Sequence, residues 1–181
     1  MKILFIGDVV GKPGRDAVAA LVPKLRRERE LDLVIANGEN SAHGAGLTSA
    51  TVKALLDAGV DVITAGDHTW DQKGFESEID GLPQVIRPLN FPPSAPGRGS
   101  TVVNAGDKTA VGVINLIGRV FLPNNDCPFR AARAEVTKLR RQTNVIIVDL
   151  HGEATSEKIA MGRYLDGQVS AVIGTHTHVQ T

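Results

Sequence analysis

The sequence has little of three things that would each place it in a particular class of protein. It contains one cysteine, Cys127, so no disulfide can form within the chain, and this suits a reducing compartment. It has no apolar run near the roughly 20 residues that a membrane span requires. Its 20 Lys+Arg balance 20 Asp+Glu, which removes the electrostatic argument for duplex nucleic acid or an anionic membrane as the main partner. We therefore expect a cytoplasmic protein in which Cys127 is a surface or half-buried structural thiol.

The two ends of the chain carry separate expectations. The apolar run at residues 3–6 is short and is broken by Gly7 and Asp8, which is not typical of a signal peptide. The last polar cluster lies only three residues before the final residue, although such a cluster normally needs a following segment to cover it. At 181 residues the chain fits one domain, so we expect a single domain over residues 1–181 that is truncated at its C-terminus.

Several short, mainly apolar runs end in polar residues of the kind that bind metal ions. The runs cover residues 3–6, 33–36, 60–63, 145–148 and 171–173, and the polar residues that follow them are Asp8, Glu39, Asn40, Asp67, His68, His151, His176 and His178. Parallel strands that are buried on both faces read as continuous apolar runs. Ligand sites in open α/β folds lie beyond the carboxyl ends of such strands. The pattern therefore predicts one metal site at one edge of a sheet.

The chain order predicts two sheets. Strands over 2–7, 32–36 and 60–64 alternate with helices over 13–29 and 49–58, the second of which Thr48 would cap. This βαβαβ start indicates a parallel sheet. Short β-type runs follow within the proline-containing region 82–129, at 84–86, 100–104, 110–117 and 119–122, with a hairpin turn at 105–108. They predict antiparallel strands in a second sheet. The expected order then ends with a helix over 129–141, a strand over 144–150, a helix over 154–165 and a strand over 169–174.

Each polar cluster has a structural alternative when it is taken alone. His176 and His178 are two residues apart, on or just past a strand, so with a period of two both imidazoles would point to one face and could serve one metal or two adjacent metals. The alternative is a pair of half-exposed loop histidines. Asp8 could instead cap a turn, and His151 could be a buried histidine that is satisfied by hydrogen bonds. His43 lies in a glycine-rich loop and is not expected to be a ligand.

The combined donor set favours two metal ions. It holds an amide, three carboxylates and up to four imidazoles, which is too many for one tetrahedral zinc. It suits two cations about 3.5–4 Å apart that share a bridging carboxylate, a pair that activates water and holds a phosphoryl group. No Ser-His-Asp or Cys-His arrangement competes with it. The segment Gly7-x-x-x-Gly11-Lys12 lacks the spacing of a P-loop. Trp70 and Phe75 are expected to be packing residues.

The order of these clusters resembles the calcineurin-like metallophosphoesterases, and more closely their bacterial YmdB-like branch. The strings that carry this resemblance are Phe5-Ile6-Gly7-Asp8-Val9, Asn37-Gly38-Glu39-Asn40, His68-Thr69-Trp70-Asp71, Arg87-Pro88-Leu89-Asn90, Glu153-Ala154-Thr155-Ser156-Glu157-Lys158 and the segment Gly174-Thr175-His176-Thr177-His178-Val179. The resemblance spans the whole chain. It implies an α/β fold in which two mixed sheets form a sandwich flanked by helices.

The same resemblance implies a role for each residue. Asp8, Asn40 and His178 would bind one metal, Asp67, His151 and His176 would bind the other, and Glu39 would bridge them. His68 would act as general acid while a metal-bridging hydroxide attacks phosphorus. The implied activity is phosphodiester hydrolysis, with 2′,3′-cyclic nucleotides such as 2′,3′-cyclic AMP as substrates. Iron or manganese is the implied metal, with zinc or magnesium as alternatives, and the implied assembly is a homodimer or tetramer.

One departure from the family pattern concerns the second metal, because Asp67 stands where the family usually has Asn. The added negative charge predicts tighter metal binding and weaker attraction for an anionic phosphate. Two other functions remain open from the sequence. One is a regulatory RNA- or nucleotide-binding protein with a weakly active site, and the other is a phosphomonoesterase. Whether Lys158, Arg87 or Asn90 contact substrate or are structural is left open as well.

Overall fold

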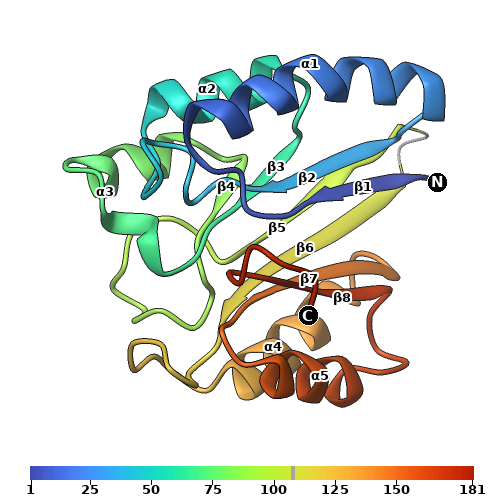
Figure 1. Ribbon diagram of the computed structural model, residues 1–181. Helices are drawn as coiled ribbons and strands as arrows, with labels where there is room; N and C mark the ends of the chain where they lie inside the picture. Colours follow the sequence, from blue (N-terminus) through green and yellow to red (C-terminus); the bar gives the residue numbers. More distant parts are fainter. Residues whose placement is uncertain (107–108) are drawn as a thin grey trace.

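The computed structural model describes residues 1–106 and 109–181 and contains two β-sheets stacked between helices (Figure 1). The first sheet has the order β1 (Ile3–Ile6), β2 (Leu33–Asn37), β3 (Val62–Thr64) and β4 (Val85–Ile86). The second has the order β5 (Ser100–Asn104), β6 (Ala110–Ile117), β7 (Val145–His151) and β8 (Ala171–Thr175). The expected two-sheet α/β sandwich is confirmed.

Only the second sheet is mixed, so the expectation of two mixed sheets is wrong for the first. Its strands pair in parallel throughout, whereas in the second sheet β5 pairs antiparallel with β6 and the other pairs are parallel. The strands of the first sheet are parallel because of the segments that connect them. Each link within the first sheet contains helical turns that carry the chain back before the next strand begins, which is what parallel neighbours require.

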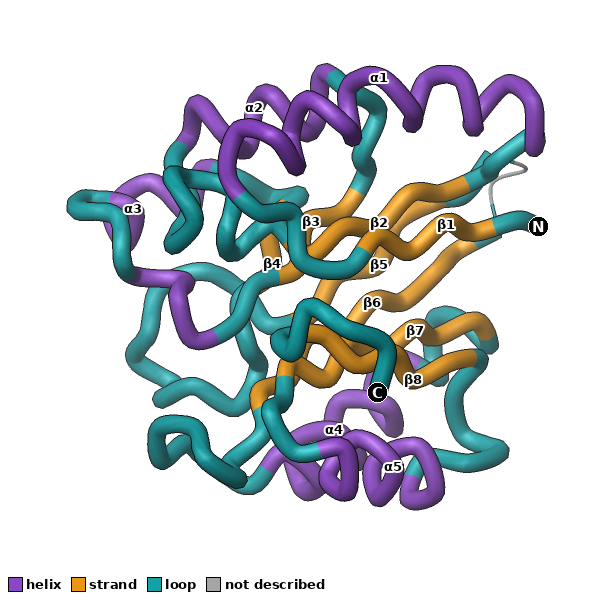
Figure 2. The backbone as a smooth tube through the Cα atoms, in the orientation of Figure 1, coloured by secondary structure: helices purple, strands orange, loops and turns teal. Residues whose placement is uncertain are grey.

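Helices cover the outer face of each sheet (Figure 2). The first sheet is covered by α1 (Gly11–Arg29) and α2 (Ser49–Asp57), and the second by α4 (Pro128–Leu139) and α5 (Thr155–Tyr164). The expected cap of α2 is confirmed, because the Thr48 side chain accepts from the backbone N–H of Thr51 in a capping box.

Three short helices were not predicted, since they are too brief to show a helical period: η1 (Asp67–Trp70), α3 (Phe75–Glu78) and η2 (Ile79–Gly81).

Strand β2 shows why the buried runs are continuous. Leu33 and Ile35 belong to the core between the two sheets, while Val34 and Ala36 belong to the core beneath the helices. All four side chains are at most 1% exposed. Because both faces of the strand are covered, both sets of alternating positions are apolar.

The segment 119–122 does not form the strand that its apolar residues predicted. The carboxylate of Glu157 accepts hydrogen bonds from the backbone N–H groups of Arg119 and Val120, at 3.0 and 3.2 Å. These bonds hold the chain in a turn, in which Phe121 has a φ of 63° and is 87% exposed. The hairpin turn predicted at 105–108 includes residues 107–108, which lie outside the described residues, and the strands on either side of it pair antiparallel.

Two smaller expectations concern membranes and the thiol. Within residues 1–106 and 109–181, the structure has no helix that is both long and apolar enough to cross a membrane. Cys127 is half-buried at the start of α4, which is one of the two expected positions.

Candidate metal centre

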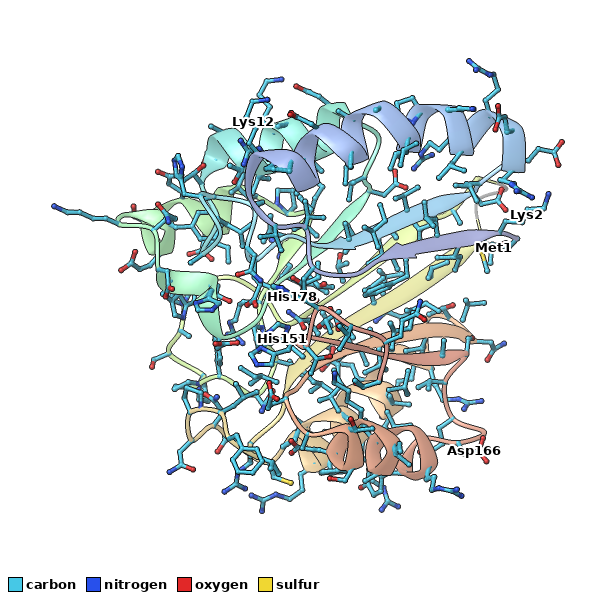
Figure 3. All side chains as sticks on the ribbon, in the orientation of Figure 1. Met1, Lys2, Lys12, His151, Asp166 and His178 are labelled. Atoms are coloured by element: carbon cyan, nitrogen blue, oxygen red, sulfur yellow. The ribbon has the colours of Figure 1, made fainter. Side chains whose placement is uncertain are left out.

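The carboxyl ends of the parallel strands in both sheets meet at one side of the molecule, toward the left of Figure 1. The register places Asn37 of β2 beside Thr64 of β3, and His151 of β7 beside Thr175 of β8. A buried hydrogen bond of 2.5 Å from Thr64 Oγ1 to Asp149 Oδ2 joins the two sheets at this level. Polar residues that are far apart in the sequence are therefore gathered in one place, where His151 and His178 are labelled in Figure 3.

One group of ligand-type side chains consists of Glu39, Asp67, His151 and His176. One donor atom from each lies within 4.8 Å of those of the other three. His151 Nε2 is 2.9 Å from both Glu39 Oε1 and Asp67 Oδ1, and His176 Nδ1 is 3.3 Å from Asp67 Oδ1. Two imidazole nitrogens and two carboxylates thus converge on one small volume.

A second group lies directly beside the first and consists of Asp8, Asn40 and His178. His178 Nε2 is 3.5 Å from Asp8 Oδ1 and 3.2 Å from the Asn40 amide. The same amide lies 3.3 Å from Glu39 Oε1, the oxygen that also contacts His151. Glu39 therefore stands between the two groups and contacts both.

Gly66 leaves the space in which Glu39 and His151 meet. A Cβ at this position would lie 2.3 Å from Glu39 Oε2 and 2.3 Å from the His151 ring. Contacts this short do not occur between real atoms, so a side chain at Gly66 would displace both groups. The sequence placed Gly66 only as a neighbour of Asp67, and nothing in the spacing showed this close approach.

Outer hydrogen bonds orient two of the histidines. His151 Nδ1 lies 2.9 Å from Thr175 Oγ1, which donates to Asp149 Oδ1 at 2.8 Å. Because the threonine hydroxyl donates to Asp149, it accepts from His151 Nδ1–H, which leaves Nε2 turned toward Glu39 and Asp67. His176 Nε2 faces Glu153 Oε2 at 3.0 Å, while its Nδ1 faces the first group. Such carboxylate and hydroxyl partners are typical of histidines that bind metals.

These outer partners were not predicted from the sequence. One signal was present, because Asp149 is a carboxylate inside an apolar run and is fully buried. Burial raises its pKa to about 6, although the hydrogen bond from Thr64 works in the other direction. Thr175 and Glu153 carry no comparable signal, since threonine and glutamate are common at strand ends and in loops.

The first group is strongly coupled electrostatically. Burial disfavours the charged form of His151, but hydrogen bonds to Asp67 and Glu39 outweigh it and raise the pKa of His151 to about 10. Burial likewise disfavours the charged form of Asp67, but the hydrogen bond from His151 outweighs it and lowers the pKa of Asp67 to about 2. In the metal-free protein at neutral pH, a proton on His151 therefore balances part of the carboxylate charge.

His68 stands at the edge of the two groups, at the start of η1. Its backbone N–H donates to Glu39 Oε2 at 3.1 Å, and its Nδ1 contacts Asp71 Oδ2 at 2.7 Å. Partial burial works against protonation, but the hydrogen bond to Asp71 outweighs it and raises the pKa of His68. Since the ring is 37% exposed, it can reach a bound molecule.

His176 and His178 lie just past a strand, which is one of the two predicted placements, but the argument that strand periodicity points both rings to one face does not hold there. Strand β8 ends at Thr175, and both histidines lie in the turn beyond it with positive φ angles of 91° and 56°. The turn directs His176 to the first group and His178 to the second. His43 is exposed and lies in neither group.

The three residues whose roles the sequence left open have internal partners. Arg87 donates to the backbone carbonyls of residues 88, 89, 95 and 96, and Asn90 bonds the backbone of Ile117 and Asp126. Lys158 donates to Thr177 Oγ1 at 3.0 Å, which holds the turn that carries both histidines. All three side chains are at most 7% exposed, so the structure gives each a supporting contact.

The residues present fit two metal ions. The set combines hard oxygen donors with imidazoles, and Glu39 is in contact with both groups. The space between Glu39 and His151 exists only because residue 66 has no side chain. The donor atoms and the space around them are therefore both compatible with two metal ions, and the role of each residue as a ligand stays a prediction.

The two sheets flanked by helices are shared with a solved phosphatase, so the protein has a fold of the metallophosphoesterase type. A solved structure of a hypothetical protein from Thermus thermophilus is 43% identical, with a TM-score of 0.93, over 100% of this chain and 69% of that one. A solved structure described as a novel phosphatase from Mycoplasma pneumoniae is 37% identical, with a TM-score of 0.91, over 100% of this chain and 66% of that one.

The chain belongs to the YmdB-like protein family, whose sequence model matches residues 4–181. A Bacillus subtilis (strain 168) relative named 2′,3′-cyclic-nucleotide 2′-phosphodiesterase is 52% identical over 181 residues, which are 100% of this chain and 68% of that protein. A Mycoplasma pneumoniae relative is 39% identical, and this chain covers 65% of it. The chain therefore spans about two thirds of the length of these relatives.

Proposed function

We propose that this protein is a dinuclear metal-dependent phosphodiesterase that hydrolyses 2′,3′-cyclic nucleotides such as 2′,3′-cyclic AMP. The observation that carries the proposal is the pair of ligand groups that share Glu39. The name of the 52% identical relative supports the choice of substrate. Hydrolysis of phosphate esters is among the reactions for which such a paired site is suited.

In this proposal Asp8, Asn40 and His178 hold one metal ion, and Asp67, His151 and His176 hold the other. Glu39, which contacts both groups, would contribute to both sites. When bound, the metals would lower the pKa of water and neutralise charge on the phosphoryl group. Iron or manganese is proposed from the resemblance to the metallophosphoesterases, with zinc or magnesium as alternatives, and a set that mixes carboxylate oxygens with imidazole nitrogens is compatible with each of them.

His68 would donate a proton to the oxygen that leaves phosphorus. Its pKa is raised and its ring is oriented by Asp71, so it holds a proton at neutral pH more readily than a free histidine. It lies beside Glu39 without belonging to the buried ligand group, which suits a residue that contacts substrate. His68 is therefore assigned as the catalytic acid.

The test is turnover by purified protein that has been loaded with manganese. We expect 2′,3′-cyclic AMP to be hydrolysed faster than a phosphomonoester such as p-nitrophenyl phosphate. Preference for the monoester would instead indicate a phosphomonoesterase. Binding of the cyclic nucleotide without turnover, in protein shown to carry two metals per chain, would indicate a regulatory nucleotide-binding protein.

We further propose a homodimer or tetramer in the cytoplasm, acting on a small nucleotide. The balanced charge of the chain supports a small substrate over duplex nucleic acid. Sedimentation velocity at several protein concentrations tests the assembly.

Replacing Asp67 by Asn tests the charge that distinguishes this site. Asp67→Asn removes a carboxylate that contacts both His151 and His176. We expect roughly tenfold weaker binding of the metal at that group, because one negatively charged ligand is lost. We also expect a lower KM for the cyclic nucleotide, because one negative charge that repels the phosphate is removed. Isothermal titration with manganese and steady-state kinetics check this. Unchanged values for both constants would contradict the expected role of the charge.

Metal affinity should rise with pH. A metal that binds His151 must displace the proton held there, and the pKa of His151 is raised to about 10. Below that pH, each unit of increase should strengthen binding at this group by up to about tenfold, because one proton is released per ion. Manganese titrations between pH 6 and 8 in buffers of different ionisation enthalpy measure both the affinity and the released proton. An affinity independent of pH would show that His151 is not a ligand.

A further inference from the structure

A pocket opens directly beside the metal centre, and the proposed chemistry does not use it. Its volume is about 250 Å³. The lining residues are Asp67, Trp70, Phe91, Pro92, Ile117, Pro123 and Asn125. They come from η1, from the loop between β4 and β5, and from the end of β6 with the loop that follows it, segments that gather at the left of Figure 1.

Flat, apolar surfaces make up most of this lining. The rings of Trp70 and Phe91 have centroids 6.3 Å apart and are tilted by 38°, and two prolines contribute further flat faces. Phe91 is 8% exposed and so is fixed in the wall, whereas Trp70 is half-buried. Aromatic faces of this kind bind the faces of nucleobases by stacking.

Two polar residues, Asp67 and Asn125, also line the pocket. Asp67 belongs both to the pocket and to the first ligand group, so a molecule in the pocket lies next to the candidate metal site. Asn125 contributes an amide, and its Nδ2 donates to the carbonyl of Pro123 at 3.0 Å. That bond orients the amide oxygen as an acceptor for an amino group on the edge of a base.

The walls are held together before anything binds. Asn90 is 2% exposed, donates from Nδ2 to the carbonyls of Ile117 at 2.9 Å and Asp126 at 2.8 Å, and accepts from Ile117 N–H at 2.9 Å. It precedes Phe91, so it ties one wall to the end of β6 and to the loop that carries Asn125. A pocket fixed in this way binds a rigid ring without the cost of ordering its loops.

We propose that this pocket binds the base of the nucleotide substrate, stacked on Trp70, while the phosphate lies at the metal centre. The assignment rests on the proposed function for the presence of a nucleotide, but the pocket can be tested separately. Trp70 packs against the core of the first sheet, as the sequence predicted, and the proposal adds a second role for it as a determinant of substrate specificity.

The first experiment uses the fact that Trp70 is the only tryptophan of the chain. Its fluorescence is measured in metal-free protein as adenosine is added, with excitation at the red edge of the tryptophan band and correction for absorption by adenosine. Saturable quenching by adenosine, but not by ribose, is the expected result. No saturable quenching at adenosine concentrations up to its solubility overturns the proposal.

The second experiment compares two substrates that differ only in the base. Trp70→Leu should lower kcat/KM for 2′,3′-cyclic AMP, relative to ribose 2′,3′-cyclic phosphate, by about tenfold or more, the usual worth of stacking one base. Phe121→Leu is the matched control, because Phe121 is 87% exposed and does not line the pocket, although it lies in the same loop as Pro123 and Asn125. Manganese binding by Trp70→Leu shows that the variant is folded.

The outcomes separate the pocket from the chemistry. An unchanged ratio between the two substrates in Trp70→Leu overturns the base pocket while leaving the phosphodiesterase intact. If neither cyclic phosphate is hydrolysed by metal-loaded protein, the proposed function fails, and the adenosine titration alone then decides whether the pocket binds a base.

Discussion

Replacing His68 by alanine should lower kcat for 2′,3′-cyclic AMP by about 10²–10⁴-fold, the usual contribution of a positioned general acid. Both metals should still bind, because His68 contacts the buried ligand group only through its backbone N–H and a longer ionic contact of 3.7 Å to Asp67. The measurement combines steady-state kinetics with metal analysis of the same preparation.

His43→Ala is the control, since His43 is an exposed loop histidine outside both ligand groups. It should leave kcat unchanged.

A second variant, Asp71→Asn, tests how the pKa of His68 is set. The neutral amide of asparagine can still accept from His68 Nδ1–H, but it lacks the negative charge of Asp71 that helps to raise the pKa of His68. The substitution should therefore move the alkaline limb of the rate profile to lower pH, because the acid then loses its proton sooner. Full activity of the His68→Ala variant would contradict the assignment of His68 as the general acid.

Gly66→Ala should abolish most activity without changing any ligand. The new Cβ would lie 2.3 Å from both Glu39 Oε2 and the His151 ring, so both must move. Displacement of about 1 Å at an active site can cost roughly 100-fold in rate. We also expect metal content to fall below two ions per chain and stability to drop by about 1–3 kcal/mol, as for other overpacked sites.

The matched control is Gly81→Ala, where a Cβ meets nothing within 4 Å. Activity and metal content should be unaffected in this variant. Metal analysis, manganese titration and urea unfolding of both variants distinguish a disturbed centre from a generally weakened fold. If Gly66→Ala binds two metals with normal affinity, the close approach of Glu39 and His151 to Gly66 is not required for metal binding.

The sequence determined most of the element order and the candidate ligands. Strands buried on both faces have continuous apolar runs, as in β2 and β7, and their polar ends can be read directly from the chain. Thr48 marked the start of α2 for a local reason, since its side chain caps its own helix. These features depend on neighbouring residues or on burial, and both leave a pattern in the sequence.

What only the tertiary structure decided depends on contacts between distant segments. Glu157 turns residues 119–120 away from a strand although they are 37–38 residues from it. The division of His176 and His178 between two groups follows from the backbone angles of one turn. The approach of Glu39 and His151 over Gly66, and the pocket formed by three separate segments beside Trp70, exist only once both sheets are packed. A linear pattern shows which groups can bind a metal or a base, but packing sets the distances between them.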